Sequence, residues 1–488
     1  MPGTIFSMTV NRKVSRLLPV RRALALAAIA AAMTIGDRAV LAQSQDTPAP
    51  VSADECRDVV TRLGQSLDER YVFPDKGTAC RAMLDELLAS GDLEGVSAPD
   101  EFARVLTGKL QDLTNDKHLR VRFRPPGAGR PEGPRENPAL ARARQLMQAR
   151  GQNYAFIKVE ILEGNIGYLD LRGFVQPFPA SRETATAAMN FLANCDAVIF
   201  DLRRNGGGSP GMIRFITSWL FEEPTHLNSL YWREGDRTEE FWTQADIPGK
   251  RLAEVPAFVL TSNFTFSGGE EFTYNLQSLK RATIIGETTG GGAHPGGTVP
   301  VGERFMAFIP TGRAINPITG TNWEGTGVVP DIQVAADDAL DTALPLAREA
   351  ADKRRQVQLA RIEDLWRRFE AALTSAPTLI SEGQSAQAEA ALRDALTEGL
   401  EAGFLGEEDI NVLGYEQLNG DRVETAILIF RVNAARFPES ANVHDSLGEA
   451  YMKAGRNEQA IESYRKALSI DPELTSAREA LKTLNAGR

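Results

Sequence analysis

The sequence predicts a multidomain chain with an N-terminal α-helical domain, a central α/β core and a C-terminal all-α repeat. Apolar residues follow helical spacing within residues 50–122, strands and helices alternate over residues 150–345, and a pattern repeats over residues 407–488. A chain of 488 residues with 42% apolar content is long enough to build a separate core in each part.

The first 42 residues are typical of an export signal. Basic residues, among them Arg21 and Arg22, precede an apolar run over residues 23–33, and small or apolar residues end at Ala42. The run is too short to span a bilayer comfortably, which disfavours the alternative of a membrane anchor. We expect cleavage of residues 1–42, a periplasmic or secreted product, and no membrane span in the mature chain.

Charge and cysteine content narrow the class of partner. The formal net charge is −11, and removing the basic signal makes the mature chain more acidic, which disfavours nucleic acid and anionic membranes as partners. No Cys/His cluster has the spacing of a zinc site, so no metal or other cofactor is expected. Cys56 and Cys80 could pair in an oxidising compartment or remain two buried thiols. Cys195 is expected to be a small core residue.

The central region alternates between strands and helices. Residues 166–171, 197–202 and 257–260 have the composition of buried strands, and each is followed by a helical pattern. This order favours a mostly parallel sheet, and ligands of such sheets bind at the carboxyl ends of the strands. Residues 201–208 and 261–269 follow two of these strands, and we expect them to line the site.

Ser267 stands between an apolar strand and a helical segment. A sharp turn there would lift its hydroxyl clear of the sheet, and the free N–H groups of the helix start could stabilise an oxyanion. The alternative is a serine that only caps the helix. Gly268 and Gly269 favour the catalytic interpretation, because a cap does not need them and a close approach of substrate does. The full G-x-S-x-G pattern is not met, since Thr265 stands at its first glycine.

The last part of the chain repeats with a 34-residue period. Gly414 recurs as Gly448 and Phe430 as Tyr464. This is the period of tetratricopeptide repeats, and residues 441–474 fit that pattern best. Two repeats are fewer than a stable array usually needs, so we expect the linking helices of residues 346–405 to complete the core of the first repeat.

A catalytic serine needs a base, and the chain has four histidines. His444 belongs to the repeat, and His226 lies in a stretch without a supporting pattern. His118 lies where the helical domain gives way to a strand. His294 lies in a glycine-rich loop that could line a cleft. His118 and His294 are therefore the rival candidates.

Four ordered motifs together resemble the tail-specific, or C-terminal-processing, serine peptidases. They are Asp201-x-Arg203-x-Asn205-Gly-Gly-Gly, the stretch from Thr261 to Phe272, the stretch from Arg281 to Gly291, and Glu324-Gly-x-Gly-Val-Val-Pro-Asp331. Residues 71–75 and 116–119 are similar to the helical N-terminal domain of the interphotoreceptor retinoid-binding protein branch. The resemblance covers about residues 50–345 and implies a core of the ClpP/crotonase type.

The resemblance implies Ser267 as the nucleophile. Where many relatives carry the lysine of a serine–lysine dyad, this chain has Gly292, so a dyad is excluded. A tricorn-like branch instead uses an upstream histidine oriented by a glutamate near the end of the core. His118 and Glu324 match these positions, although Lys117 stands where that branch has a serine.

The same resemblance points to the remaining site residues and to the function. The N–H groups of Gly207 and Gly268 would form the oxyanion hole, while Asp201, Arg203 and Asn205 would brace the glycine turn. The predicted function is an exported serine endopeptidase acting on polypeptides, with a possible protein partner at the tetratricopeptide repeats. The alternatives are an inactive peptide- or lipophile-binding protein on the same fold, and a scaffold in which the repeats do the main work.

Overall fold

The structure is a computed structural model that describes residues 48–125 and 137–486. The predicted export signal, residues 1–42, lies outside the described residues. Within them, no helix combines the length and the apolar character that crossing a membrane requires.

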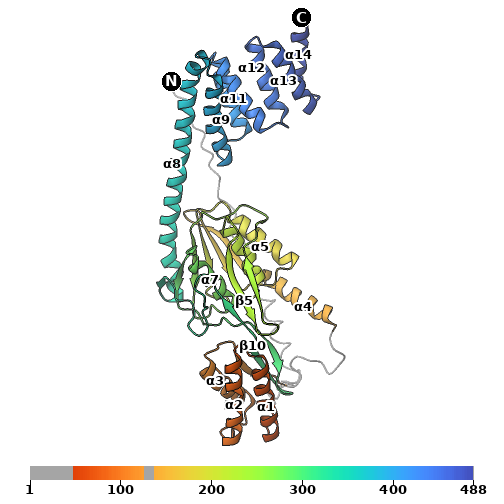
Figure 1. Cartoon of the computed structure of the whole chain (residues 1–488), viewed down its shortest axis with the longest axis vertical. Helices are drawn as coiled ribbons and strands as arrows, with labels where there is room; N and C mark the ends of the chain where they lie inside the picture. Colours follow the sequence, from red (N-terminus) through yellow and green to blue (C-terminus); the bar gives the residue numbers. More distant parts are fainter. Residues whose placement is uncertain (1–47, 126–136, 487–488) are drawn as a thin grey trace, which may run out of the picture. The chain divides into compact units, whose positions relative to one another are not determined.

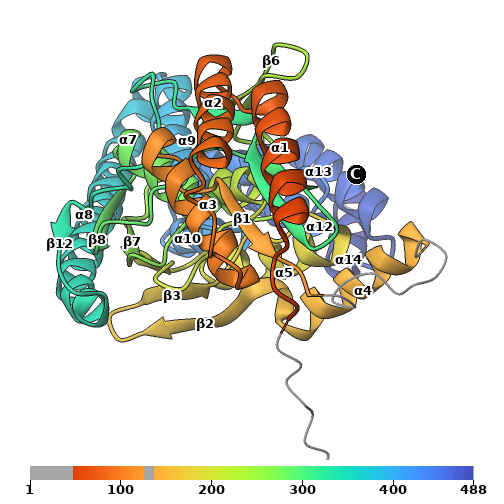
Figure 2. The same ribbon diagram turned by 90° about the horizontal axis from the view of Figure 1, so that it is seen from below.

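Three helices form the N-terminal part of the described chain (Figure 2), and they are α1 (Ala53–Arg70), α2 (Pro74–Ser90) and α3 (Pro99–Thr114). Ser52 caps α1 by accepting the N–H of Glu55, while α2 and α3 each begin with a proline, which suits the first turn of a helix. Val60, Leu63 and Leu67 are buried on one face, as their spacing predicts.

A small antiparallel sheet shares the core of these helices. It has the order β1 (Arg120–Phe123), β10 (Phe305–Pro310) and β9 (Gly296–Pro300). Phe305, Ala307 and Ile309 of β10 belong to the same apolar cluster as the three helices. The helical domain is therefore completed by a strand about 180 residues further along the chain, and this pairing brings residues 116–120 to the α/β core.

The α/β core is built on a six-stranded sheet (Figure 1), with the order β12 (Ile332–Gln333), β8 (Ala282–Gly286), β7 (Ala257–Thr261), β4 (Ala197–Asp201), β3 (Ile166–Leu171) and β2 (Phe156–Leu162). Only β2 runs antiparallel to its neighbour; the other pairs are parallel. The predicted mostly parallel sheet is confirmed.

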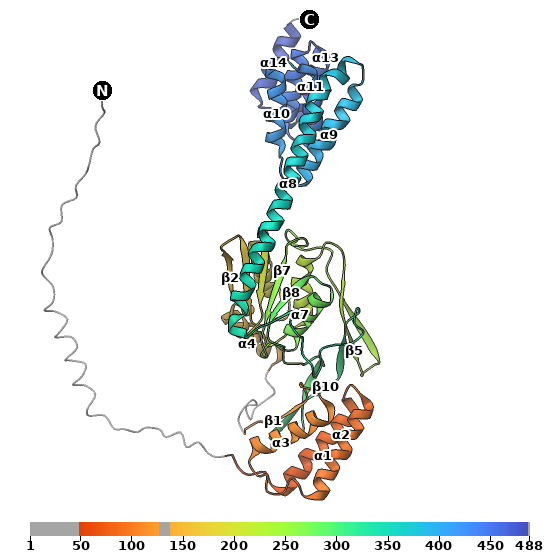
Figure 3. The same cartoon turned by 90° about the vertical axis from the view of Figure 1, so that its left-hand side faces the viewer.

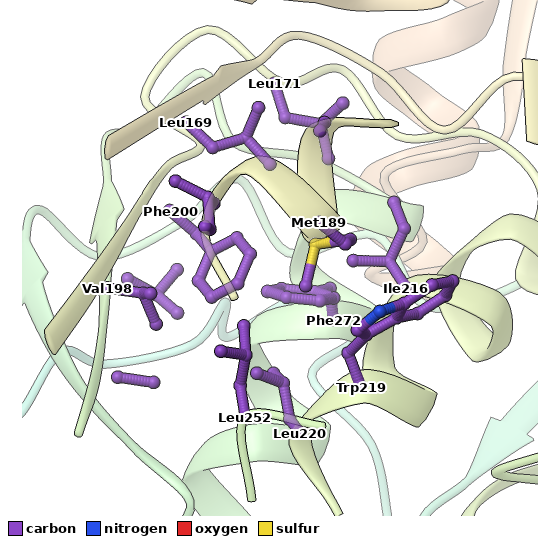
Figure 4. Packing of buried hydrophobic residues seen from close by; sticks show 14 of the residues in the cluster. Leu169, Leu171, Met189, Val198, Phe200, Ile216, Trp219, Leu220, Leu252 and Phe272 are labelled. Atoms are coloured by element: carbon purple, nitrogen blue, oxygen red, sulfur yellow. The ribbon is translucent and has the colours of Figure 1, made fainter. Parts of the chain in front are cut away.

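Alternate residues of the central strands face two different apolar clusters. Val198 and Phe200 of β4 pack with Phe272 and Trp219 in one cluster (Figure 4). Helices of this face are α5 (Pro179–Phe191), α6 (Pro210–Thr217) and α7 (Gly268–Ser278). On the opposite face, Ile199 packs against alanines of helix α8 (Ala339–Ser381). A strand buried on both faces explains the continuous apolar run in the sequence.

A second antiparallel sheet and several short elements surround the core. The sheet has the order β11 (Gly312–Ile315), β5 (His226–Trp232) and β6 (Arg237–Trp242). The remaining elements are α4 (Pro138–Gly151), η1 (Asn153–Ala155), η2 (Ser218–Leu220) and η3 (Ala336–Asp338). His226 lies in β5, on a strand that the sequence did not reveal.

The C-terminal part is helical throughout and follows α8 with α9 (Ser385–Glu401), α10 (Glu407–Asn419), α11 (Val423–Arg436), α12 (Ala441–Lys453), α13 (Asn457–Ile470) and α14 (Thr475–Ala486). The repeated glycines have a steric reason. A methyl group at Gly414 would lie 2.4 Å from the Phe430 ring, and one at Gly448 would lie 2.8 Å from the Tyr464 ring. Each glycine lets the aromatic ring of the next helix approach its backbone.

The first repeat is completed by the preceding helices, as predicted. Figure 3 shows α8 as one unbroken helix. Its later residue Phe369 and Leu392 of α9 share an apolar cluster with Ile410 of α10 and Ile429 of α11. The linking residues 346–405 thus supply the third layer that two repeats alone would lack.

All three cysteines are free thiols. The suggested pairing of Cys56 with Cys80 is not formed, and the alternative of two unpaired thiols describes this structure. Burial raises the pKa of the Cys80 thiol to about 11 and that of Cys195 to about 11, so both stay protonated near neutral pH.

Candidate active site

The backbone at Ser267 adopts a conformation that L-residues rarely take. Ser267 is the N-cap residue of α7 and has φ 54° and ψ −118°. A serine with positive φ carries strain that the surrounding structure must hold in place. The Ser267 N–H donates to Glu270 Oε2 at 2.7 Å, and the Phe266 N–H donates to the Asn205 carbonyl at 3.1 Å. The turn is therefore fixed from both sides.

Glu270 is the buried anchor of this turn. Besides the Ser267 N–H, its carboxylate accepts hydrogen bonds from the Thr289 hydroxyl and from the N–H groups of Gly291 and Gly292. Burial raises the pKa of Glu270, while these hydrogen bonds oppose the shift. Glu270 thereby ties the serine turn to the 289–292 loop.

The glycine turn after β4 packs directly against Ser267. A methyl group at Gly207 would lie 2.8 Å from Ser267 Cβ, and one at Gly208 would lie 2.2 Å from the Phe174 carbonyl oxygen. The Gly207 N–H donates to Asn205 Oδ1 at 2.8 Å, so it is already used inside the turn. Gly207 therefore shapes the turn. Because its N–H is already bonded to Asn205, it is not free to act as the predicted oxyanion donor.

Gly208 and Gly268 offer the neighbouring N–H groups. A methyl group at Gly268 would lie 2.8 Å from the Gly208 nitrogen, so the two backbones are in close approach. Among the hydrogen bonds of residues 48–125 and 137–486, none uses the N–H of either glycine. Gly208 also lines the same cleft as Ser267.

His118 reaches this cleft from the N-terminal helical part. Its imidazole lies 4.7 Å from the Phe266 ring and 5.7 Å from the Phe308 ring, measured between centroids. His118 and Ser267 line one cleft of ≈ 600 Å³ together with residues of β1, β9 and β10. The structure thus brings together two predicted site residues that are 149 positions apart in the sequence.

Gly292 makes room for this histidine. A methyl group at position 292 would lie 2.6 Å from His118 Cε1 and 2.3 Å from Phe266 Cζ. The imidazole and the Phe266 ring therefore occupy the space into which any side chain at position 292 would begin. This contact explains physically why a glycine accompanies the histidine.

The environment of His118 keeps its ring neutral. Burial lowers its pKa to about 4, the charge of Asp116 acts in the opposite direction, and Arg120 and His294 lower the pKa further. His118 Nδ1 is buried without a hydrogen-bond partner among the described residues. At neutral pH the imidazole can accept a proton, as a general base must.

Glu324 does not contact the imidazole of His118. Its Oε1 accepts the Lys117 N–H at 2.8 Å, and its Oε2 accepts the N–H groups of Ala293 and His294 at 2.5 and 3.0 Å. The expected carboxylate–imidazole bond is absent, because the carboxylate is used by backbone groups on both sides. Burial, followed by the nearby Asp116, raises the pKa of Glu324 to about 7.

Asp116 is a site residue that the sequence analysis missed. This fully buried carboxylate accepts the N–H groups of His118 and Leu119 on Oδ1, at 3.0 and 3.3 Å. Its Oδ2 accepts the Tyr71 hydroxyl at 2.9 Å and contacts His294 Nδ1 at 2.7 Å. The signal was an aspartate two residues before the histidine, since such side chains bond the backbone two residues on.

His294, the rival base, belongs to this carboxylate cluster. It is buried, pairs with Asp116, and has its Nδ1 3.5 Å from Glu324 Oε2. It is not among the residues that line the cleft with Ser267. The structure therefore places His118 and Ser267 in one cleft, and it places His294 in the buried cluster with Asp116 and Glu324.

Asp116, His294 and Glu324 could also offer three ligand atoms to a metal ion, because these atoms lie within 4.8 Å of one another. All four carboxylate oxygens already accept hydrogen bonds from the protein. The hydrogen bonds account for the arrangement of the cluster without an ion.

The Asp201–Arg203 pair braces the turn, as expected. Arg203 Nη2 lies 2.6 Å from Asp201 Oδ2, and the Tyr168 hydroxyl donates to the same oxygen at 2.6 Å. Arg203 also donates to the Ala336 carbonyl. These contacts fix the residues before the glycine turn.

Comparison with known families agrees with this geometry. Residues 165–334 match the model of Peptidase family S41, and they include the serine turn, the glycine turn and Glu324. The core domain belongs to peptidase family S41. Residues 53–163 match the N-terminal domain of this peptidase family in eukaryotic IRBP, and residues 441–474 match the tetratricopeptide repeat. The predicted family resemblance is confirmed.

Three individual proteins show limited similarity to this chain. A carboxy-terminal-processing protease of Bartonella bacilliformis is 28% identical over 176 residues, which is 36% of this chain and 39% of that protein. The photosystem II D1 C-terminal processing protease has a TM-score of 0.37 at 15% identity, over 58% of this chain and 94% of that chain. The tricorn protease has a TM-score of 0.40 at 12% identity, over 62% of this chain and 37% of that chain.

Proposed function

We propose that this S41 protein is a serine endopeptidase that cleaves polypeptides with Ser267 as the nucleophile and His118 as the general base. One observation carries the proposal: Ser267 sits on a strained turn and shares one cleft with a histidine that is neutral at physiological pH. A strained nucleophile, an adjacent base and unused backbone donors are the parts that acyl transfer needs.

His118 accepts the Ser267 proton as the serine oxygen attacks the carbonyl carbon of the scissile bond. Because Nδ1 is buried, Nε2 is the nitrogen that serves the serine. The N–H groups of Gly208 and Gly268 stabilise the oxyanion of the tetrahedral intermediate, with each donor contributing about 10²- to 10³-fold in rate. His118 then protonates the leaving amine, and a water molecule hydrolyses the acyl-enzyme by the same route.

Asp116 and Glu324 act as positioning residues in this proposal. Asp116 holds the His118 backbone and its negative charge favours the imidazolium that forms during the reaction. Glu324 holds Lys117 on one side and the 293–294 backbone on the other. Glu324 thereby orients His118 through the main chain and not through the ring.

A fluorophosphonate probe tests the nucleophile directly. The full-length protein should be labelled at Ser267, and labelling should vanish in Ser267→Ala. Ser469→Ala, which removes an exposed hydroxyl of the repeat region, is the control and should be labelled normally. Labelling that is unchanged in Ser267→Ala would refute the assignment of the nucleophile.

A second function has an observation of its own. His118 Nδ1 has no hydrogen-bond partner among the described residues, so none of their carboxylates would directly stabilise an imidazolium at this position. A binding protein on the same fold that does not catalyse a reaction would not need such a partner. An unlabelled Ser267 in a folded protein that still binds peptides would favour this candidate over the peptidase.

We also propose that the protein acts after export, with cleavage following Ala42. The support is the order of basic, apolar and small residues in the first 42 positions. Amino-terminal sequencing of the exported protein should begin at or near Gln43. An intact Met1 on active protein in the cytoplasm would contradict export.

The repeats are proposed to engage a protein partner and not to take part in bond cleavage. A chain ending before the repeats should keep hydrolysis of a small ester and lose action on a large polypeptide. A fragment from about residue 346 should be more stable than one from residue 405, because Phe369 and Leu392 complete the core. Equal melting temperatures would contradict that contribution.

A further inference from the structure

A row of three arginines lines the cleft beside the proposed nucleophile. Arg120 and Arg122 lie in β1, and Arg124 follows directly after it. Side chains alternate between the two faces of a strand, so these three share one face. Val121, between the first two, is buried in the N-terminal apolar cluster on the other face. All three arginines line the cleft that contains Ser267 and His118.

These arginines have no acidic partner among the described residues. Arg120 donates to the Lys117 carbonyl, and Arg124 donates weakly to the Glu303 carbonyl at 3.4 Å. The exposed Arg122 side chain makes no hydrogen bond to residues 48–125 or 137–486. No aspartate or glutamate lines the cleft. The buried charge of Asp116 acts on Arg120, but no member of the row forms an ion pair with a described residue, although the chain has a formal net charge of −11.

The rest of the cleft presents apolar surface next to this charge. Phe308 lies opposite Arg120 in the β1–β10 register, and Met306 lies opposite Arg122. The Arg120 guanidinium lies 5.9 Å from the centroid of the Phe266 ring, one residue before the nucleophile. An entering polypeptide would therefore meet positive charge and apolar side chains next to each other in the cleft.

We infer that this cleft selects polypeptides that carry carboxylate groups close to the scissile bond. The inference rests on the proposed peptidase function and specifies its substrate class. Arg120 is nearest in sequence to His118, and the strand rise puts Arg122 and Arg124 about 7 and 13 Å further along. An extended substrate has the same spacing, so the carboxylates fall within about four residues of the bond that is cut.

Guanidinium groups suit this task. Their planar donors match both oxygens of a carboxylate, and they stay charged at any physiological pH. Two sources can supply the carboxylate: aspartate or glutamate side chains, and the terminal carboxylate of a chain cut near its end. Both offer the same charge and the same acceptor geometry to the row.

The test measures binding and does not need turnover. Full-length Ser267→Ala is titrated into fluorescent decapeptides that differ only in one pair of residues, Glu, Gln or Lys, with amidated C-termini. A fourth peptide has the Gln pair and a free terminal carboxylate. We expect the Glu or the free-carboxylate peptide to bind about threefold to tenfold tighter than the amidated Gln peptide, with the difference shrinking at high salt.

Variants at Arg122 test whether the preference for carboxylate-bearing peptides depends on the arginine row. Arg122→Gln, made in the Ser267→Ala background, should abolish most of the difference, and Arg122→Glu should reverse it in favour of the Lys peptide. Arg237→Gln, which changes an exposed arginine on β6 outside the cleft, is the control and should keep the preference. Equal affinity for all four peptides, or an acidic preference that survives Arg122→Glu, would overturn the inference.

The outcomes also separate this inference from the peptidase proposal. A tighter Glu peptide identifies side chains as the source, and a tighter free-carboxylate peptide identifies the chain terminus; either supports the inference. Fluorophosphonate labelling of Ser267 together with equal peptide affinities would overturn the substrate class alone. A carboxylate preference without labelling would support the subsite and remove the peptidase function.

Discussion

The cleft around His118 and the buried cluster around His294 each contain an imidazole, but the two imidazoles differ in their hydrogen bonding. His294 is paired with Asp116, and every carboxylate oxygen of the cluster accepts a hydrogen bond. His118 lies between two aromatic rings with its Nδ1 unpartnered and its pKa lowered to about 4. An imidazole paired with a buried carboxylate holds structure, whereas a neutral imidazole that lines the cleft of the serine can accept its proton. This difference is why we propose His118 as the base and His294 as a supporting residue.

The largest expected effect is loss of the nucleophile or of the base. Ser267→Ala and His118→Ala should each reduce kcat by about 10⁴- to 10⁶-fold, and the double variant should lose little more than either, because the two act as one unit. Steady-state hydrolysis of a peptide substrate measures this. Multiplicative losses would show that the two residues act independently and would undo the pairing.

A single methyl group at position 292 should disable the base without removing it. Gly292→Ala places a carbon within 2.6 Å of His118 Cε1, so the ring must move, and we expect kcat to fall about 100-fold or more. Gly297→Ala is the matched control, because a methyl group there meets no atom within 4 Å. The melting temperatures of both variants should be compared, and equal kcat values would mean that His118 is free to relocate.

Asp116→Asn should weaken the base and the structure together. The amide keeps one acceptor oxygen but presents an NH₂ group to partners that donate, and it removes the charge that favours the imidazolium. We expect kcat to fall about 100-fold, with a loss of about 1–3 kcal/mol in unfolding free energy. The exposed Asp112→Asn on α3 is the control for helix effects. Unchanged kcat with lowered stability would reduce Asp116 to a purely structural residue.

Replacing the histidine of the cluster should have a smaller effect on catalysis. His294→Gln leaves Ser267 and His118 in their cleft, and we expect a change in kcat of about tenfold or less, because only a supporting contact is lost. If His294→Gln is inactive while His118→Ala retains activity, the two regions exchange roles and His294 is the base.

The smallest effect is expected in the pH dependence. Because the pKa of His118 is lowered to about 4, the neutral base persists on the acid side, and kcat/KM should lose its His118-dependent part only as pH falls through about 4. Glu324 gains its charge as pH rises through about 7, because its pKa is raised to about that value. We expect kcat/KM to change by a few-fold in this pH range, and this change should be absent in Glu324→Gln. An acid limb near 6.5 would show that the ring is less buried in solution than in this structure.

The sequence alone predicted the architecture that the structure confirms, and it singled out Ser267 as the candidate nucleophile. Alternation of strand and helix patterns predicted the parallel sheet, the 34-residue period predicted the repeats, and the glycines around Ser267 predicted its turn. These features follow from local preferences, because side-chain periodicity and glycine conformations are properties of short segments. Gly292, at the position where many relatives carry a lysine, also excluded the dyad from the sequence alone.

Tertiary structure alone decided which groups meet at the site. The pairing of β1 with β10 brings His118 to Ser267, and no local pattern shows that pairing because about 180 residues separate the strands. The hydrogen bonds of Asp116, Glu270 and Glu324 depend on the same long-range contacts, as does the use of the Gly207 N–H by Asn205. A carboxylate can bond a ring or a backbone equally well, and only its position in the folded chain determines which donor it reaches.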